Sequence, residues 1–211
     1  MKHAPLAGLC LALLAPAAMA LDASSVKLSV YSVMLSTSPL CSSPVTVFSN
    51  PTPVDVDFLS GPTLGKGSPA DGTYNCVIIK MKDLIRFKPS GSAGSCVAGN
   101  EYTIDVCRSD NSGTSGAPDS TGAPTACTGT DSAPAADTVY LYLTTNSSAG
   151  SRGNTFSQPT STASGNGLNL TAPLVISGNA KSKFVVNATG KVDGANGPCG
   201  MEPPIFGFEK L

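Results

Sequence analysis

Hydrophobic residues recur at every second position along much of this chain, a spacing that predicts β-strands. The alternation is clearest in YTIDVC (102–107) and VYLYL (139–143). Further short apolar runs, separated by turn-forming residues, are VTVF (45–48), VDVDF (54–58), LNL (168–170), LVI (174–176), KFVVN (183–187) and IFGF (205–208). We expect about nine or ten short strands in all, with the SNPTP segment separating the runs at 45–48 and 54–58.

The first strand is expected at VKLSVYSVMLS (26–36), where the alternation changes phase. Val26, Leu28 and Val30 point one way in a regular strand, whereas Val33 and Leu35 point the other way. A change of phase within a strand is typical of a β-bulge or a bend. We therefore predict an irregularity near Tyr31 and Ser32.

The stretch SPADGTYNCVIIKMKDLIRFKP (68–89) predicts a turn followed by a two-faced strand. Pro69 to Gly72 have the residue types of a turn. One face of the strand is apolar and the other is cationic, as expected of a sheet between core and solvent. The apolar set is Val77, Ile79, Met81, Ile85 and Phe87, and the cationic row is Lys80, Lys82, Arg86 and Lys88. Asp83 interrupts the apolar set, so a second bulge is expected near Lys82 and Asp83.

Two long segments at about 108–138 and 144–167 are rich in Ser, Gly, Thr, Pro and Ala. They contain too few apolar residues to build a core, so we expect surface loops inserted into the domain. The whole pattern favours an all-β chain in which residues 21–211 form a single antiparallel, immunoglobulin-like β-sandwich. Two smaller sandwiches joined near residue 108 are the alternative.

The first 20 residues have the pattern of a cleaved signal peptide. Lys2 precedes the apolar run Leu6 to Leu14, and Ala18 to Ala20 provide a site of the small-x-small type. Lipidation at Cys10 is disfavoured because Leu9 stands where a lipoprotein signal needs a small residue. No later run is apolar enough to span a membrane. We expect a secreted protein, or one at the periplasm or outer cell surface.

Composition narrows the chemistry of the mature chain. Its charge is nearly balanced, because removing Lys2 leaves 12 Lys and Arg against 14 Asp and Glu. Nucleic acid is therefore not an expected partner. The single histidine, His3, lies in the signal peptide, which excludes catalysis by a nucleophile paired with histidine. No catalytic or phosphate-binding motif is present, so we expect no enzyme activity and no cofactor.

Six cysteines remain in the mature chain, at positions 41, 76, 96, 107, 127 and 199. An even number of cysteines in an exported chain predicts disulfides. A metal site would need clustered cysteines or histidine partners, so none is expected. Six cysteines allow 15 pairings. We favour Cys107–Cys127, which closes a polar loop, Cys41–Cys76, which joins two strand regions, and the remaining pair Cys96–Cys199.

The order of these segments resembles exported bacterial β-sandwich modules of the transthyretin-like (prealbumin-like) kind. In such modules a Pro-Ala-Gly-Thr-Tyr element precedes a central strand, as PADGTYNCVIIKM does here. The opening also resembles an uncharacterised family of bacterial lipoproteins and secreted proteins. The resemblance covers residues 26–88 and 167–188, and the chain departs from it by Asp71, its cysteines and its long loops. It implies a transthyretin-like sandwich with a role in display, adhesion or assembly, and no catalytic residues.

Three sets of polar residues are candidate sites. The cationic row Lys80, Lys82, Arg86 and Lys88 could bind an acidic polysaccharide, although outward lysines also keep sheets soluble. Asp55 and Asp57 share a strand face about 7 Å apart, which is compatible with the two acids of a glycosidase. Calcium could bind oxygen ligands in the long loop, at Asp110, Asn111, Asp119 and Asp131. An isopeptide bond between Lys27 and Asn187 is a further, less favoured possibility.

The favoured hypothesis is a non-enzymatic surface, adhesion or appendage-associated module stapled by disulfides. Its partner would be a cell-surface glycan or another envelope protein. One alternative is a lectin-like carbohydrate binder or a weak carboxylate-based glycoside hydrolase. Another is a self-assembling filament subunit in which an exposed strand edge pairs with a second copy.

Overall fold

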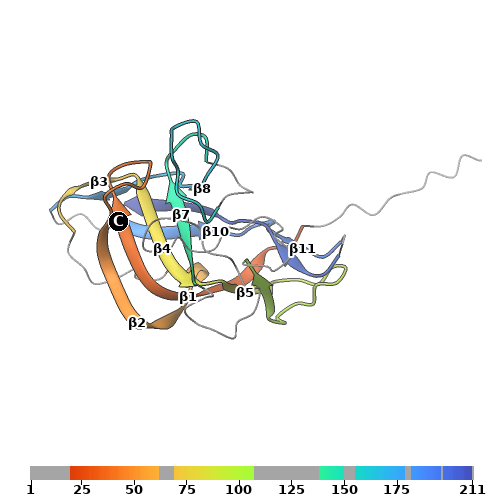
Figure 1. The fold of residues 1–211 in the computed structure, drawn as a ribbon. Coiled ribbons are helices and arrows are strands. Elements are labelled where there is room, and N and C mark those ends of the chain that lie inside the picture. The colour runs from red at the N-terminus through yellow and green to blue at the C-terminus, as the bar shows by residue number, and fades with distance from the viewer. Residues whose placement is uncertain are drawn as a thin grey trace, which may run out of the picture.

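The computed structural model describes residues 20–61, 69–106, 138–149, 155–178, 182–195 and 197–210. Strands dominate this part of the chain (Figure 1). The elements are β1 (Ala23–Ser36), β2 (Val45–Asp57), the 3-10 helix η1 (Phe58–Ser60), β3 (Gly72–Tyr74), β4 (Cys76–Lys82), β5 (Leu84–Pro89), β6 (Tyr102–Asp105), β7 (Thr138–Thr144), β8 (Leu168–Asn169), β9 (Leu174–Ile176), β10 (Ser182–Asn187), β11 (Val192–Asp193), β12 (Gly200–Met201) and β13 (Ile205–Lys210). Within the described residues, no helix is long and apolar enough to cross a membrane. The prediction of an all-β chain is confirmed.

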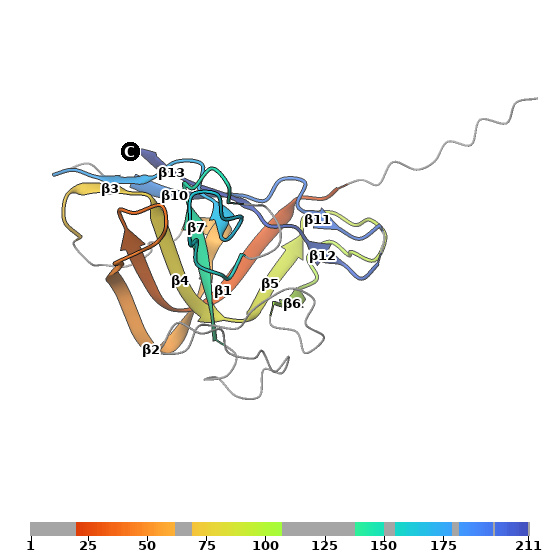
Figure 2. The ribbon, with the colours of Figure 1, turned by 45° about the horizontal axis from the view of Figure 1, so that its top comes forward.

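Seven strands form the main sheet, in the order β6-β5-β1-β4-β7-β8, with β2 paired to β1. The pairs are antiparallel except for β7 with β8. The sheet is strongly curled into a half-barrel, and the strand pair β10–β13 lies across its open side (Figure 2). Two more strand pairs, β3–β9 and β11–β12, lie outside the main sheet.

A bulge at Tyr31 lets the long first strand keep one face in the core. Val30 pairs with Met81 and Val54, and Ser32 pairs with Lys80 and Ser49, so that Tyr31 is skipped in both ladders. The extra residue restores the phase of the alternation. Leu28, Val30, Val33 and Leu35 consequently belong to one buried cluster. The bulge occurs where the sequence predicts it, but the expectation that Val33 and Leu35 face away from Leu28 and Val30 is wrong.

The chain bends at Asp83, where the sequence predicts a second irregularity, and one extended segment is divided there into β4 and β5. Both strands pair with the edge of β1 opposite β2, with Met81 against Val30 and Arg86 against Lys27. The main-chain carbonyl of Asp83 accepts a hydrogen bond from Val106 N, and the side chain of Asp83 is buried. The predicted apolar face lies inward, since Val77, Ile79, Met81 and Phe87 are each 0% exposed.

Among the described residues, strand β2 is an edge strand of the main sheet and pairs only with β1, in two separate segments. Its residues 54–57 pair with 27–30. Its residues 45, 46, 48 and 49 pair with 32–35, and Val47 is skipped at a register shift. The four residues Asn50 to Pro53 lie opposite Tyr31 alone and have no partner in the ladder. SNPTP therefore interrupts the pairing, as the sequence suggests, but the expectation that it ends one strand and begins another is wrong, because the backbone stays extended throughout.

The main hydrophobic core fills the concave side of the curled sheet. Inward residues of β1, β4 and β7 meet Phe58 of η1 and two aromatic residues of the β10–β13 pair, Phe184 and Phe206. The ring of Phe58 packs edge-on against Phe184 with the centroids 5.7 Å apart. The pair β10–β13 thus closes the core by burying apolar area, the dominant favourable term in folding.

A smaller core lies at the end of the molecule formed by β5, β6, β11 and β12. It contains Val26, Phe87, Ala188 and Val192 beside the buried Cys96. The disulfide Cys96–Cys199 joins residues 103 positions apart in the sequence. The disulfide Cys41–Cys76 closes a shorter separation of 35 residues. Both pairs are those that the sequence predicts.

The polar segment at 144–167 is more than a surface loop. Phe156 lies in the main core and is 7% exposed. Asn146 is buried and its amide donates to the carbonyls of Ser161 and Ser164, which ties the segment together. The expectation of an entirely superficial loop is wrong here, because one aromatic residue is enough to anchor it. Residues 1–19, the pair Cys107–Cys127 and most of the predicted loop at 108–138 lie outside the described residues.

Candidate functional site

Strand β4 buries Val77, Ile79 and Met81 on the inner side of the main sheet. The opposite side of the sheet carries polar and aromatic side chains. We call this the outer face and define it by its side chains: Lys27, Ser29, Tyr31, Ser32, Ser49, Asp55, Lys80, Lys82, Arg86, Lys88, Glu101 and Tyr140. The register brings them into rows across the sheet, because directly opposed residues of neighbouring strands share a face. One row contains Ser49, Ser32, Lys80 and Tyr140, contributed by β2, β1, β4 and β7.

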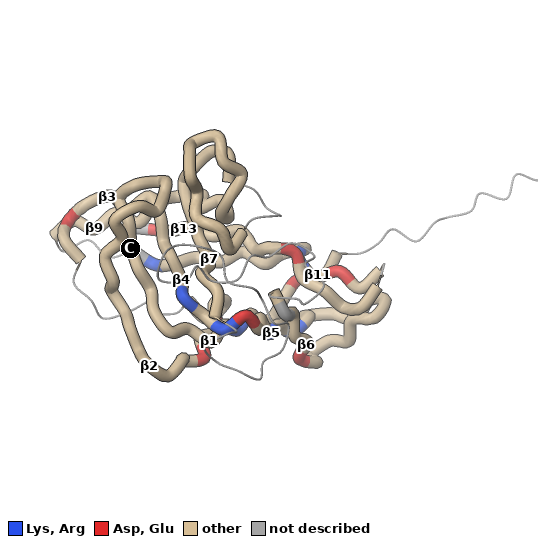
Figure 3. Tube along the Cα trace, viewed as in Figure 1, with Lys and Arg blue, Asp and Glu red and all other residues tan. Residues whose placement is uncertain are grey.

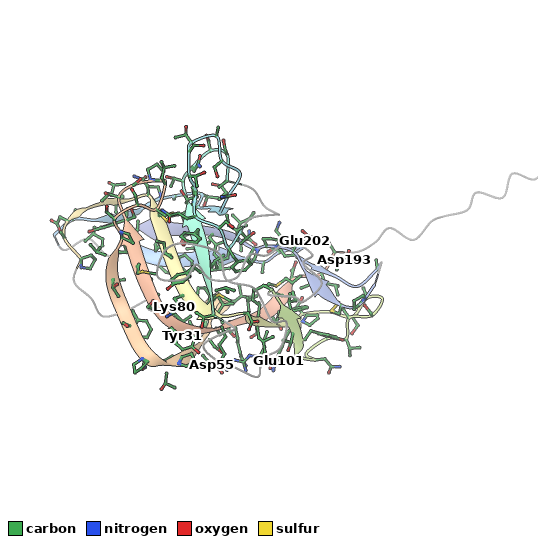
Figure 4. The ribbon with its side chains drawn as sticks, viewed as in Figure 1. Tyr31, Asp55, Lys80, Glu101, Asp193 and Glu202 are labelled. Carbon is green, nitrogen blue, oxygen red and sulfur yellow. A yellow bond between two sulfur atoms is a disulfide. The ribbon has the colours of Figure 1, made fainter. Side chains whose placement is uncertain are left out.

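Lys80 lies between two tyrosine rings on this face. Its Nζ is 5.7 Å from the centroid of Tyr31 and 5.9 Å from the centroid of Tyr140. All three side chains are half-buried. An ammonium over the face of an aromatic ring at this distance is attracted by the quadrupole of the ring. The two rings therefore hold the amine in a defined position, and Figure 4 shows Tyr31 and Lys80 together on the sheet.

Arg86, in the same cationic row, is neutralised by an acid from β2. Its Nη2 lies 2.7 Å from Oδ2 of Asp55. Ser29 Oγ donates to Oδ1 of the same carboxylate at 2.6 Å. The hydrogen bonds from Arg86 and Ser29 hold the pKa of Asp55 below its ordinary value. Lys27 likewise forms an ion pair with Glu101 at 3.4 Å, so this part of the outer face is balanced in charge (Figure 3).

Asp57, the second candidate acid, is held by the backbone. Its Oδ1 accepts hydrogen bonds from Leu59 N at 3.1 Å and Val26 N at 3.3 Å, and its Oδ2 accepts one from Ser25 Oγ at 2.7 Å. Asp57 is the N-cap of η1. A glycosidase needs one carboxyl group with a raised pKa to act as the general acid. The lowered pKa of Asp55 is opposite to this requirement. The carboxylate of Asp57 is occupied by its three hydrogen bonds.

The four cations that the sequence singled out thus have different neighbours. Lys80 is flanked by tyrosines and Arg86 by Asp55. Lys82 and Lys88 are half-buried and lie opposite Thr138 and Ser25. Sequence reasoning singled out the row but missed Tyr31 and Tyr140. The alternation in VYLYL signals that Tyr140 points outward, whereas the position of Tyr31 depends on the geometry of its bulge.

One end of the sheet's outward side is covered by the chain itself. Cys76, Ile78 and Tyr142 are buried there together with Cys41 from the segment that follows β1. Burial raises the pKa of Tyr142 to about 12, so this phenol stays neutral at ordinary pH. The open part of the outward side therefore begins at Lys80 and Tyr140, which are half-buried.

Two hollows elsewhere on the molecule are weaker candidates for a ligand-binding site. An apolar hollow of about 120 Å³, partly open to solvent, lies against Phe58, Phe156 and Phe206. Ligand pockets have volumes of roughly 300–1,000 Å³, so this hollow is smaller than a usual ligand pocket. A hollow of about 250 Å³ lies near Asp193 and Glu202, which Figure 4 places away from Lys80. The carboxylate of Asp193 accepts a hydrogen bond from Ala195 N at 2.8 Å.

Metal and covalent chemistry receive no support from the part of the chain that the structure describes. It contains no group of three or more side chains able to hold a metal ion. The proposed calcium ligands Asp110, Asn111, Asp119 and Asp131 lie outside it. The isopeptide pair is not formed, because Lys27 contacts Glu101 on the main sheet whereas Asn187 belongs to β10 and accepts a hydrogen bond from Thr189 N.

Comparisons of this chain with models of protein families, with curated proteins and with solved structures found no match.

Proposed function

We propose that this chain is a non-enzymatic module of the cell surface that works by adhesion or by association with a surface appendage. The observation that carries the proposal is the outer face, on which aromatic and charged side chains are held at fixed positions by paired strands. Binding sites on strands are more rigid than sites on loops. The two disulfides suggest an oxidising environment outside the cytoplasm, which is where an adhesive surface can meet its partner.

A transthyretin-like sandwich is the finer fold that we propose with this function. In that arrangement β10 and β13 belong to a second layer facing the curled main sheet. Phe184 and Phe206 support it, because they pack into the same core as the inward residues of β1 and β4.

A bead assay tests the adhesive role. Beads coated with the mature protein should be retained on intact cells of the species that exports it, against albumin-coated beads as the control. Retention should fall for Lys82→Glu combined with Arg86→Glu, provided that circular dichroism shows the variant folded. Retention no greater than that of albumin-coated beads contradicts an adhesive role.

The glycoside hydrolase alternative has little support, given the surroundings of Asp55 and Asp57. It is tested by release of reducing sugar from polysaccharides. Hydrolysis by the wild-type protein that is lost in Asp55→Asn or Asp57→Asn would support the glycoside hydrolase alternative.

Self-assembly is favoured by one observation, the position of β2 at an edge of the main sheet. Val45 and Val54 on this strand are 49% and 41% exposed. The same edge contains Pro51 and Pro53, which lack a donor and discourage strand addition. A concentration-dependent increase in mass on gel filtration, lost on Val47→Pro, would support pairing through β2.

A further inference from the structure

The best-defined group on the outer face is the cluster of Tyr31, Lys80 and Tyr140. We propose that this cluster binds the hexuronate units of an acidic polysaccharide, with the ammonium of Lys80 paired to the sugar carboxylate and the two tyrosine rings packed against the sugar. This inference rests on the proposed function and names the class of ligand that the adhesive face would recognise.

The outer face contains more cations than acids, and the acids lie at one end, where Asp55 contacts Arg86 and Glu101 contacts Lys27. In the described part of the chain, Lys80 has two tyrosine rings as neighbours and no carboxylate in ion-pair contact. A carboxylate brought to Lys80 therefore meets a positive charge without displacing an existing ion pair.

Apolar ring faces suit the C–H face of a pyranose, and a tyrosine hydroxyl can also form a hydrogen bond. Tyr31 occupies the bulged position of β1, and bulges are known to redirect side chains beside functional sites. The interruption of β2 at Asn50 to Pro53 lies opposite the same residue. Both strand irregularities thus occur next to the Tyr31 ring.

The row Ser49, Ser32, Lys80 and Tyr140 crosses four strands, a span of about 14 Å at the usual spacing of strands. The cluster does not line either of the hollows described above. An open row with hydroxyl groups on both sides of one cation suits a stretch of polymer chain better than an enclosed small molecule. Of the two serines on β1 and β2, Ser49 is exposed and Ser32 is buried, so Ser49 rather than Ser32 offers its hydroxyl group to a ligand.

Binding of the mature protein to polygalacturonate is the direct test, measured by isothermal titration with neutral galactan as the uncharged comparison. We expect binding to polygalacturonate, and not to galactan, that weakens as salt is raised. Lys80→Ala and Tyr31→Ala should each weaken it at least tenfold. Tyr31→Phe should retain it within about threefold, because the ring face is preserved.

Lys191→Ala is the matched control, since it removes a half-buried lysine at a different part of the surface. An equal loss in Lys191→Ala and Lys80→Ala would mean general charge attraction and would overturn the site. Equal affinity for dextran sulfate and polygalacturonate would mean a site that does not distinguish sugar carboxylates from sugar sulfates and would overturn the ligand class. Thermal unfolding of each variant guards against misfolding.

The outcome is separable from that of the proposed function. If the protein-coated beads adhere to cells but the protein does not bind polygalacturonate, this inference is wrong and the adhesive role is still supported. If the beads do not adhere and the protein does not bind polygalacturonate, both the adhesive role and this inference are wrong.

Discussion

Ile79 and Lys80 are neighbours on β4 that face opposite sides of one sheet. Ile79 is 0% exposed and belongs to the main core. Lys80 is half-buried between Tyr31 and Tyr140 on the outer face. The comparison teaches that the fold and the proposed activity depend on alternate residues of the same strands. Substitutions on the two faces should therefore have separable effects, with stability governed by the inner face and binding by the outer face.

The largest expected effect comes from the disulfide at the covered end of the sheet. Removing Cys41–Cys76 through the double variant Cys41→Ala, Cys76→Ala should lower the free energy of unfolding by about 4 kcal/mol, because the bond closes a loop of 35 residues. Denaturant titration measures this loss. A loss below about 1 kcal/mol would contradict a stapling role for this disulfide and would show that packing alone keeps this end covered.

The next largest loss of stability is expected from a core residue of β7. Leu143 is 0% exposed and faces the main core, so Leu143→Ala should lower the free energy of unfolding by about 3 kcal/mol. The comparison variant is Tyr140→Ala on the outer face, which should lower it by about 1 kcal/mol or less. Equal losses in the two variants would remove the distinction between the faces.

The smallest effect concerns the ion pair of Asp55 and Arg86. Asp55→Asn should lower the free energy of unfolding by less than about 1 kcal/mol at pH 7, since the side chain of Asp55 is 58% exposed and solvent screens the pair. The pKa of Asp55 is lowered from 3.8 in the folded chain. The stabilisation is therefore complete above pH 3.8 and is lost as the pH falls through the lower folded value.

Denaturant titrations of wild type and Asp55→Asn between pH 7 and pH 2 measure this dependence. The difference between the two proteins should shrink in the acid range. A difference that grows as the pH falls would show that the carboxyl group is destabilising when ionised.

Much of the inner face could be predicted from the sequence. Alternation in residues 77–87 identifies the buried side chains, since period-two burial is a local property of a strand. Change of phase in β1 likewise predicts the bulge at Tyr31. The predicted pairs Cys41–Cys76 and Cys96–Cys199 are present because the cysteines flank strands that pair or pack together.

The outer face was less predictable, for physical reasons. The ion pair of Arg86 with Asp55 depends on the pairing of β1 with both β2 and β5, which is a long-range property. The direction of the Tyr31 side chain depends on the geometry of the bulge, whereas the sequence pattern predicts only that a bulge is present. Phe156 shows the same limit, because a single aromatic residue in a polar segment gives no periodic signal of its burial.

The most direct test of the separation of the two faces measures both properties in Ile79→Ala and Lys80→Ala. Each variant is unfolded with denaturant and titrated with polygalacturonate under conditions in which it is folded. We predict that Ile79→Ala loses about 3 kcal/mol of unfolding free energy and keeps wild-type affinity. Lys80→Ala should lose about 1 kcal/mol or less and at least tenfold in affinity. Retained affinity in Lys80→Ala, or a loss of stability equal to that of Ile79→Ala, would contradict the account.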